Sequence, residues 1–244
     1  MVTDVDIYNK LTEMVQPGGV VVEFVGTAGT GKTSLFNELK KRGYPGLCCA
    51  DYPEVWKISS YTFYIKNIIL LLPTLVRLFI NHSGFVKRRE LAFMAILNGW
   101  DEYLDRLTDA TNTTILLDQG AIFLIAYLNI WGPRGLWKPN MQGWWDKVFK
   151  KWSKTIDLIF LLDASDEILI SRINSRTQDH HLKGGNKQIS QNWIAKYRSL
   201  YNEILDKLAS FNQNILIIRI NSGEHTIEDI LNKIVPELLL STIN

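Results

Sequence analysis

The chain alternates between short apolar runs and longer segments in which apolar residues recur every three or four positions. Short apolar runs bounded by turn residues are typical of buried strands, and the periodic segments are typical of helices that bury one face. The short runs predict strands at residues 20–25, 47–50, 113–117, 158–162 and 215–220. The periodic segments predict helices at residues 33–42, 55–79, 87–109, 121–130, 193–208 and 226–240. This alternation predicts an α/β fold, with a five-stranded, doubly wound parallel sheet flanked by helices.

The length of the chain is that of a single domain. A chain of 244 residues can form one sizeable core, and an α/β domain of this length needs no second domain. We expect one domain over residues 1–244, with a leading helix at 1–19, a helical insert at 55–110 and a lid at 172–190. The composition, 46% hydrophobic and 21% charged, is that of ordinary globular protein.

The most specific motif follows the first predicted strand. Gly26, Gly31, Lys32 and Thr33 fit the pattern G-x-x-x-x-G-K-[ST], in the strand-then-helix setting that this pattern requires. Glycine permits backbone angles that a Cβ would forbid, so successive N–H groups can turn inward around phosphate oxygens. The N-terminus of the following helix adds a partial positive charge. The motif predicts a P-loop NTPase fold, with a nucleotide bound by Gly26, Thr27, Ala28, Gly29, Thr30, Gly31, Lys32, Thr33 and Ser34.

The expected cofactors are ATP and Mg²⁺. Lys32 would reach the β- and γ-phosphates, and the Thr33 hydroxyl would ligate the metal ion. Asp118 ends the third predicted strand, where a carboxylate could be the other protein ligand of Mg²⁺ opposite the loop. A simple turn carboxylate is the alternative for Asp118. We therefore expect Thr33 and Asp118 to be the metal-binding residues.

Three further residues are candidates for catalysis. Arg172 and Arg176 are four residues apart on one predicted helix face, just before a polar stretch at residues 177–188. This pattern is typical of a lid whose arginines neutralise a transferring phosphoryl group, although an exposed helix end with a flexible loop would look the same. Asp51 follows the second predicted strand, at the sheet edge where ligands bind in open parallel sheets. It could equally cap the next helix.

These segments resemble the thymidylate kinase and deoxynucleoside kinase group of P-loop kinases. The likeness lies in the P-loop, in DLIFLLDASDEILISRINSR (157–176), in WIAKYRSLY (193–201) and in ILIIRINSGEHTIEDILNKI (215–234). The resemblance implies that Asp51, five residues before Trp56, accepts the proton of the attacked hydroxyl. It also implies that Asp118 is the acid of the group's Asp-Arg or Glu-Arg motif, and that the protein is a homodimer.

The chain departs from that group in its arginines. Gln119 stands where the Asp-Arg motif has its arginine, and no arginine lies between Arg89 and Arg106, where thymidylate kinases carry one for the acceptor's phosphate. A phosphorylated acceptor would thereby lose two bidentate partners. The departure argues against thymidylate as the substrate, unless Arg88 or Arg89 substitutes for the missing residues.

Two apolar segments have no assigned role. In residues 58–80, the uncharged run from Asn67 to Val76 is about half as long as a membrane-spanning helix needs. We expect this helix to be deeply buried or covered by a partner subunit. Attachment to a membrane surface, helped by the basic residues 87–89, is the less favoured alternative. The tryptophans of residues 131–152 could form a stacking wall for a ring-shaped substrate or the apolar underside of a long surface loop.

Charge and cysteine content add little. A net charge of +2 is too small to indicate a nucleic-acid partner, and two adjacent cysteines fit a reducing cytoplasm. We expect a cytoplasmic, ATP- and Mg²⁺-dependent kinase of a small metabolite, with nucleosides and nucleotides among the candidate acceptors. The alternative is a nucleotide-binding switch or accessory ATPase that docks a partner or a membrane surface through residues 58–80.

Overall fold

The computed structural model describes residues 19–54, 57–80, 86–111, 113–177 and 179–240. The expected leading helix therefore lies outside the described residues.

The five expected strands form one parallel sheet with the order β2-β3-β1-β4-β5. Their bounds are Val21–Val25 for β1, Leu47–Cys49 for β2, Thr114–Leu117 for β3, Leu158–Asp163 for β4 and Leu216–Asn221 for β5. In the centre of the sheet, Val22 of β1 is in register with Leu116 on one side and with Leu158 on the other. The chain leaves β1 on one side for β2 and β3 and returns past it to β4 and β5. The prediction of a doubly wound sheet is confirmed, and it places the ligand site beyond the carboxyl end of β1.

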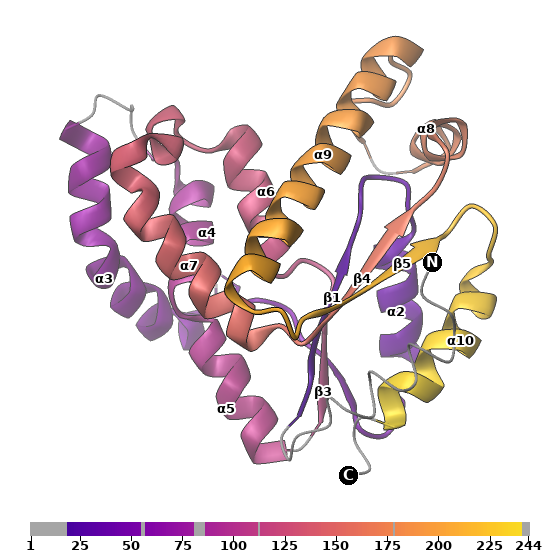
Figure 1. The fold of residues 1–244 in the computed structure, drawn as a ribbon, viewed down its shortest axis with the longest axis horizontal. Coiled ribbons are helices and arrows are strands. Elements are labelled where there is room, and N and C mark those ends of the chain that lie inside the picture. The colour runs from indigo at the N-terminus through magenta and orange to yellow at the C-terminus, as the bar shows by residue number, and fades with distance from the viewer. Residues whose placement is uncertain (1–18, 55–56, 81–85, 112, 178, 241–244) are drawn as a thin grey trace.

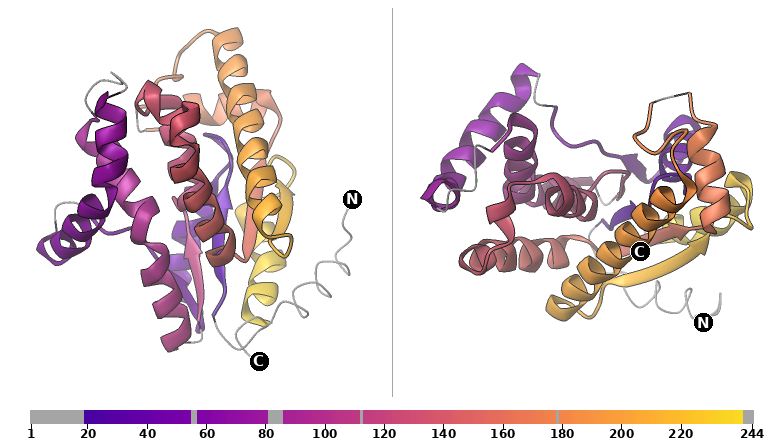
Figure 2. Two further views of the ribbon diagram at one scale, coloured as in Figure 1. Left: turned by 60° about the vertical axis from the view of Figure 1, so that its left-hand side comes forward. Right: turned by 90° about the horizontal axis from the view of Figure 1, so that it is seen from above.

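Helices cover both faces of the sheet (Figures 1 and 2). On one face, Val22 and Phe24 pack against α2 (Lys32–Arg42) and α10 (Ile227–Leu240). On the other face, Val21 and Val25 belong to the larger core, which includes residues of α6, α7 and α9. These three helices span Ala121–Trp131, Gln142–Thr155 and Lys187–Phe211. The alternation of side chains along β1 thus divides the molecule into two cores.

The helical insert lies on the side of α6 and α7, with α3 outermost (Figure 1). It comprises a 3₁₀ turn (Ile58–Ser60), α3 (Tyr61–Ile80), α4 (Arg88–Gly99) and α5 (Asp101–Thr111). The single helix expected at residues 87–109 is therefore two helices, which meet at Trp100. The expectation that α3 is deeply buried is wrong. Its only extensive neighbour among the described elements is α4, which covers one side of it.

The tryptophans of residues 131–152 are mostly core residues. Trp145 donates its indole N–H to the Leu136 carbonyl (2.7 Å), and Trp152 donates to the Leu97 carbonyl (3.0 Å). These bonds satisfy the indole nitrogens, so both rings can be fully buried. Neither a substrate-stacking wall nor the underside of a loop describes them, because they lie on α7 and fill the space between helices. Trp131, at the end of α6, and Trp137 are the partly exposed members of the segment, at 48% and 38%.

Candidate active site

The P-loop has the backbone shape that the sequence predicts. Gly26 (φ +151°) and Gly29 (φ +91°) lie in the left-handed region. A Cβ on Gly26 would come within 2.3 Å of the Leu162 carbonyl oxygen, and one on Gly29 within 2.8 Å of the Leu169 carbonyl oxygen. Both glycines are therefore required by φ and by the close approach of β4 and of α8 (Asp166–Asn174).

Lys32 is folded back onto the loop. Its Nζ donates to the Thr27 carbonyl (3.1 Å), and the Thr30 hydroxyl donates to the same oxygen (3.0 Å). Burial lowers the pKa of Lys32 to about 8, although the nearby Asp118 carboxylate opposes the shift. An ammonium that has lost much of its hydration shell is well suited to bind phosphate oxygens.

Thr33 and Asp118 are in contact, as the sequence predicts. The Thr33 hydroxyl donates to Oδ2 of Asp118 (3.0 Å). The other oxygen, Oδ1, is buried and has no hydrogen-bond partner among the described residues. Burial raises the pKa of Asp118, and the Lys32 ammonium opposes that shift. A hydroxyl and a carboxylate with one unpaired oxygen, beside a phosphate loop, fit Mg²⁺, which prefers oxygen ligands.

The two lid arginines have different surroundings. Arg172 donates to the Ser222 carbonyl (2.8 Å) and weakly to the Gly29 carbonyl (3.4 Å), so it joins α8 to the P-loop and to the turn after β5. Arg176 lies beyond the end of α8, so the expectation of a shared helix face is wrong. The positive charge of its exposed guanidinium contributes to the lowered pKa of the Lys32 ammonium. Of the two, Arg176 has the guanidinium that is free to turn toward a phosphoryl group.

The segment after Arg176 contacts α9. His180 and His181 stack on each other (ring centroids 4.4 Å apart), and both rings contact Trp193 of α9. Burial lowers the pKa of His180 to about 4, helped by the charges of His181 and Arg176. The histidines are therefore neutral aromatic contacts at neutral pH.

Asp51 lies at the carboxyl end of β2 and is exposed to solvent. It forms a salt bridge with Lys40 of α2 (2.9 Å). Its negative charge contributes to the raised pKa of Asp118. The next described helical turn begins only at Ile58, so the alternative that Asp51 caps this helix is wrong. The Asp51 carboxylate is therefore close enough to Asp118 to act on it electrostatically, and Lys40 binds it at the surface.

Comparison with known proteins shows the fold. No family model matches the chain, and no curated protein matches it. The solved structure of thymidylate kinase from Candida albicans matches 91% of this chain and 92% of its own, with a TM-score of 0.53 and 16% identity. The chain shares the overall fold of that solved structure. A deoxyadenosine kinase from M. mycoides with bound dATP matches 88% of this chain and 100% of its own at a TM-score of 0.46 and 16% identity.

An aromatic cluster lies between β2, α4 and α6. The cluster comprises Tyr52, Phe93, Phe123 and Tyr127, whose neighbouring ring centroids are 4.8 to 6.5 Å apart. The Arg89 guanidinium lies 4.8 Å from the ring centre of Tyr127 and 5.3 Å from that of Phe93. No carboxylate in the described part of the chain pairs with Arg89. Sequence reasoning missed the cluster, because its members come from three separate segments.

Glu23 is a second residue that sequence reasoning missed. It is fully buried in β1 and accepts hydrogen bonds from the backbone N–H groups of Ile122 and Phe123 (both 3.2 Å), at the N-terminus of α6. A Cβ on Gly120 would come within 2.5 Å of its carboxylate. Burial raises the pKa of Glu23 to about 8. The detectable signal was one acid within the apolar strand VVVEFV.

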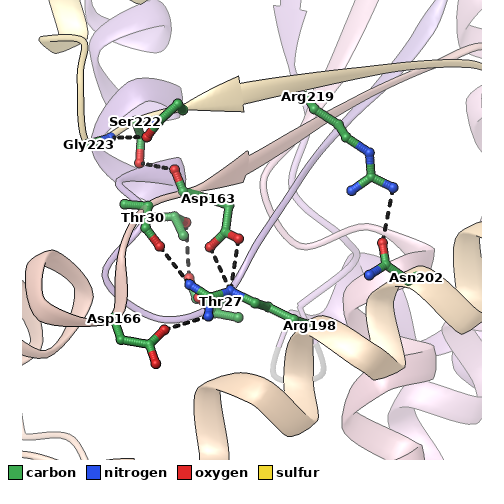
Figure 3. Close-up of polar contacts among 11 residues, drawn as sticks. Thr27, Thr30, Asp163, Asp166, Arg198, Asn202, Arg219, Ser222 and Gly223 are labelled. Carbon is green, nitrogen blue, oxygen red and sulfur yellow. Dashed lines mark hydrogen bonds and ion pairs between the residues drawn. The ribbon is translucent and has the colours of Figure 1, made fainter. Parts of the chain in front are cut away.

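Arg198 of α9 joins the end of β4 to the start of α8 (Figure 3). It donates to both carboxylate oxygens of Asp163 (3.1 and 2.8 Å), to the carboxylate of Asp166 and to the Ala164 carbonyl. Asp163 ends β4 and Asp166 begins α8, so one guanidinium fixes the origin of the helix that carries Arg172. The three nitrogens of one guanidinium donate to three different residues, which requires the planar, multiply donating group of arginine.

Proposed function

We propose that the protein is a kinase that transfers the γ-phosphoryl group of ATP to a hydroxyl of a small nucleoside-like or nucleotide-like acceptor. The observation that carries the proposal is the contact between Thr33 and Asp118 beside the P-loop, with one Asp118 oxygen left unpaired. A P-loop alone would serve any nucleotide-binding protein. A metal-binding pair together with a separate acid at the end of β2 supports phosphoryl transfer.

The donor side would be bound by the P-loop. The loop amides would surround the phosphates, and the Lys32 ammonium would leave the Thr27 carbonyl to contact the β- and γ-phosphates. Thr33 and Asp118 would hold Mg²⁺, which when bound neutralises charge on the phosphates. Arg176 would approach the transferring group from the lid side. Arg172 would keep α8 in place through its contacts with Gly29 and Ser222.

The acceptor side would be formed by Asp51, the aromatic cluster and Arg89. Asp51 would accept the proton of the attacking hydroxyl, while the bond between the γ-phosphorus and the bridging oxygen breaks and ADP leaves. The aromatic cluster offers a surface for a planar ring. Because no described carboxylate pairs with Arg89, its guanidinium can bind an anionic group on the acceptor. Arg89 would thus be the substitute for the arginines missing from positions 119 and 90–105.

The test is Mg²⁺-ATP turnover measured as ADP release with nucleosides, nucleoside monophosphates and sugars. We expect one acceptor class to stimulate turnover strongly. In Lys32→Ala, the stimulated rate should fall by about 10³-fold, because a phosphate-binding charge is lost. Lys41→Ala, on the exposed side of the same helix, is the matched control and should behave like wild type. Full turnover in Lys32→Ala would exclude this assignment.

A nucleotide-dependent switch is the second candidate. The exposed apolar side of α3 favours it, because a surface of that kind can dock a partner. This candidate predicts ATP binding without stimulation by any small acceptor, and a silent Asp51→Asn variant. The acceptor panel therefore distinguishes the two candidates directly.

A further inference from the structure

One side of α3 exposes an almost unbroken apolar surface, which we call the outer face of α3. Its side chains are 48% to 72% exposed and follow helical spacing: Tyr61, Ile65, Ile69, Leu72, Val76, Phe79 and Ile80. Soluble monomers rarely expose contiguous apolar patches of this kind without a function. Figures 1 and 2 both place α3 at the periphery of the molecule, far from the sheet and the P-loop.

The opposite side of α3 fixes the helix against the protein. Tyr64, Asn67, Leu71 and Leu78 are buried there. The Asn67 side chain accepts a hydrogen bond from Asn98 of α4 (3.1 Å) and donates one to the Phe63 carbonyl (2.9 Å). By length and composition α3 could cross a membrane, since it has 20 residues and an 18-residue window of it has a mean hydropathy of 1.7. In this structure one side of α3 is packed against α4, and the other side is exposed to solvent.

Basic residues outnumber acidic ones around the outer face. Between residues 57 and 89 there are six basic residues and no acidic residue. Lys66 and Arg77 are eleven residues apart, or about three turns, so both lie along the same edge of the outer face. The three lysines of this segment pair with carboxylates from outside it (Glu54, Glu90 and Glu102), so six basic residues stand beside three acidic ones. The side chain of Lys87, beyond the end of α3, is 81% exposed.

We propose that the outer face of α3 binds the surface of an anionic lipid bilayer, with the helix lying in the plane of the interface. An apolar side bordered by basic residues is the arrangement of in-plane membrane helices, because long basic side chains reach the headgroups while the apolar side enters the acyl boundary. A second copy of the chain fits less well. An antiparallel two-fold packing of the outer faces would set the same basic edge against itself, and like charges oppose association.

The experiment is flotation of the full chain with vesicles. One set contains phosphatidylcholine alone, and the other contains phosphatidylcholine with phosphatidylglycerol. We expect binding to the anionic vesicles, with a several-fold loss when the salt is raised from about 0.1 to 0.5 M. Ile69→Asp/Val76→Asp places two charges in the centre of the outer face and should reduce binding by about tenfold or more. Ile189→Asp is the matched control, because Ile189 is 63% exposed on α9, and it should bind like wild type.

Several results would overturn the proposal. They are wild-type protein that does not float with anionic vesicles, an Ile69→Asp/Val76→Asp variant that still floats, and equal loss in Ile189→Asp. A wild-type dimer in light scattering that becomes a monomer in Ile69→Asp/Val76→Asp would assign the outer face to a second copy instead. All three substituted side chains are exposed, so we expect unchanged circular dichroism. Turnover with a soluble acceptor should also be unchanged in Ile69→Asp/Val76→Asp, which separates this test from that of the kinase activity.

Discussion

The donor side and the acceptor side of the candidate site are built in different ways. On the donor side, a run of consecutive residues, 26–34, supplies backbone amides, and Asp118 is added from one neighbouring strand. The side chains there already contact one another, as the contact between Thr33 and Asp118 shows. On the acceptor side, Asp51, Arg89 and the aromatic cluster come from β2, α4 and α6, and Asp51 is paired with Lys40 instead.

This difference separates what is common to P-loop proteins from what is specific to this chain. Backbone amides recognise phosphate whatever the acceptor is, so the donor side is preorganised and its sequence pattern is compact. Specificity for the acceptor depends on a few side chains whose spacing in the sequence is arbitrary. Substitutions on the donor side should therefore remove turnover with every acceptor, whereas those on the acceptor side should change the preference among acceptors.

The largest effect is expected for Asp118→Asn. The amide keeps the shape of the side chain and an oxygen for Thr33, but it removes the charge that Mg²⁺ needs. We expect kcat to fall by about 10²–10³-fold with every acceptor, and the Mg²⁺ concentration for half-maximal rate to rise. Titration of turnover with Mg²⁺ measures both. Asp146→Asn, an exposed carboxylate on α7, is the control. Unchanged Mg²⁺ dependence in Asp118→Asn would contradict its role as a ligand.

Asp51→Asn should have the next largest effect. Loss of the proton acceptor should lower kcat by about 10–10²-fold while the KM for ATP stays the same, because the donor side is intact. Lys40→Ala separates proton transfer from positioning, since it frees the Asp51 carboxylate without removing it. We expect Lys40→Ala to retain turnover within a few-fold of wild type. Equal losses in the two variants would show that the Lys40 salt bridge, and not the carboxylate, is what matters.

Arg89→Gln should change the acceptor preference more than the rate. If Arg89 binds an anionic group, the KM for phosphorylated acceptors should rise by about tenfold, while uncharged acceptors are little affected. Arg88→Gln, one residue away, is the control. Steady-state kinetics with a nucleoside and its monophosphate compare the two directly. The same KM change for both acceptors would mean that Arg89 only supports the rings of Phe93 and Tyr127.

The sequence predicted the five strands, most of the helices and the position of the P-loop, because these depend on neighbouring residues, but it missed α7. The split of residues 87–109 at Trp100 was missed because helical periodicity continues across it. Two predictions that were based on apolar composition were wrong. Composition could not show that α4 covers only one side of α3, or that backbone carbonyls accept the indole N–H groups of Trp145 and Trp152. Arg89 and Asp51 approach the same region only after β2 and α4 have packed.

Glu23→Gln should have the smallest effect on turnover and tests the link between the two sides. Glu23 lies in β1, which leads into the P-loop, and it binds the N-terminus of α6, which carries Phe123 and Tyr127. The amide oxygen of glutamine can accept the same hydrogen bonds, so we expect turnover within a few-fold of wild type. In Glu23→Ala these backbone N–H groups lose their acceptor, so this variant should lose both stability and acceptor-dependent turnover.

The clearest signature of Glu23→Gln is the pH dependence of stability. The pKa of Glu23 is about 8 in the folded protein and about 4.5 when it is exposed. Between these values the unfolded chain releases the proton and the folded chain keeps it, so the free energy of unfolding of wild type falls as pH rises toward 8. A glutamine side chain does not titrate. The Tm of the variant minus the Tm of wild type should therefore increase from pH 5 to pH 8. Each 1 kcal/mol corresponds to about 2–4 °C in a chain of this size. A Tm difference that is constant across this range would mean that Glu23 is charged in the folded protein.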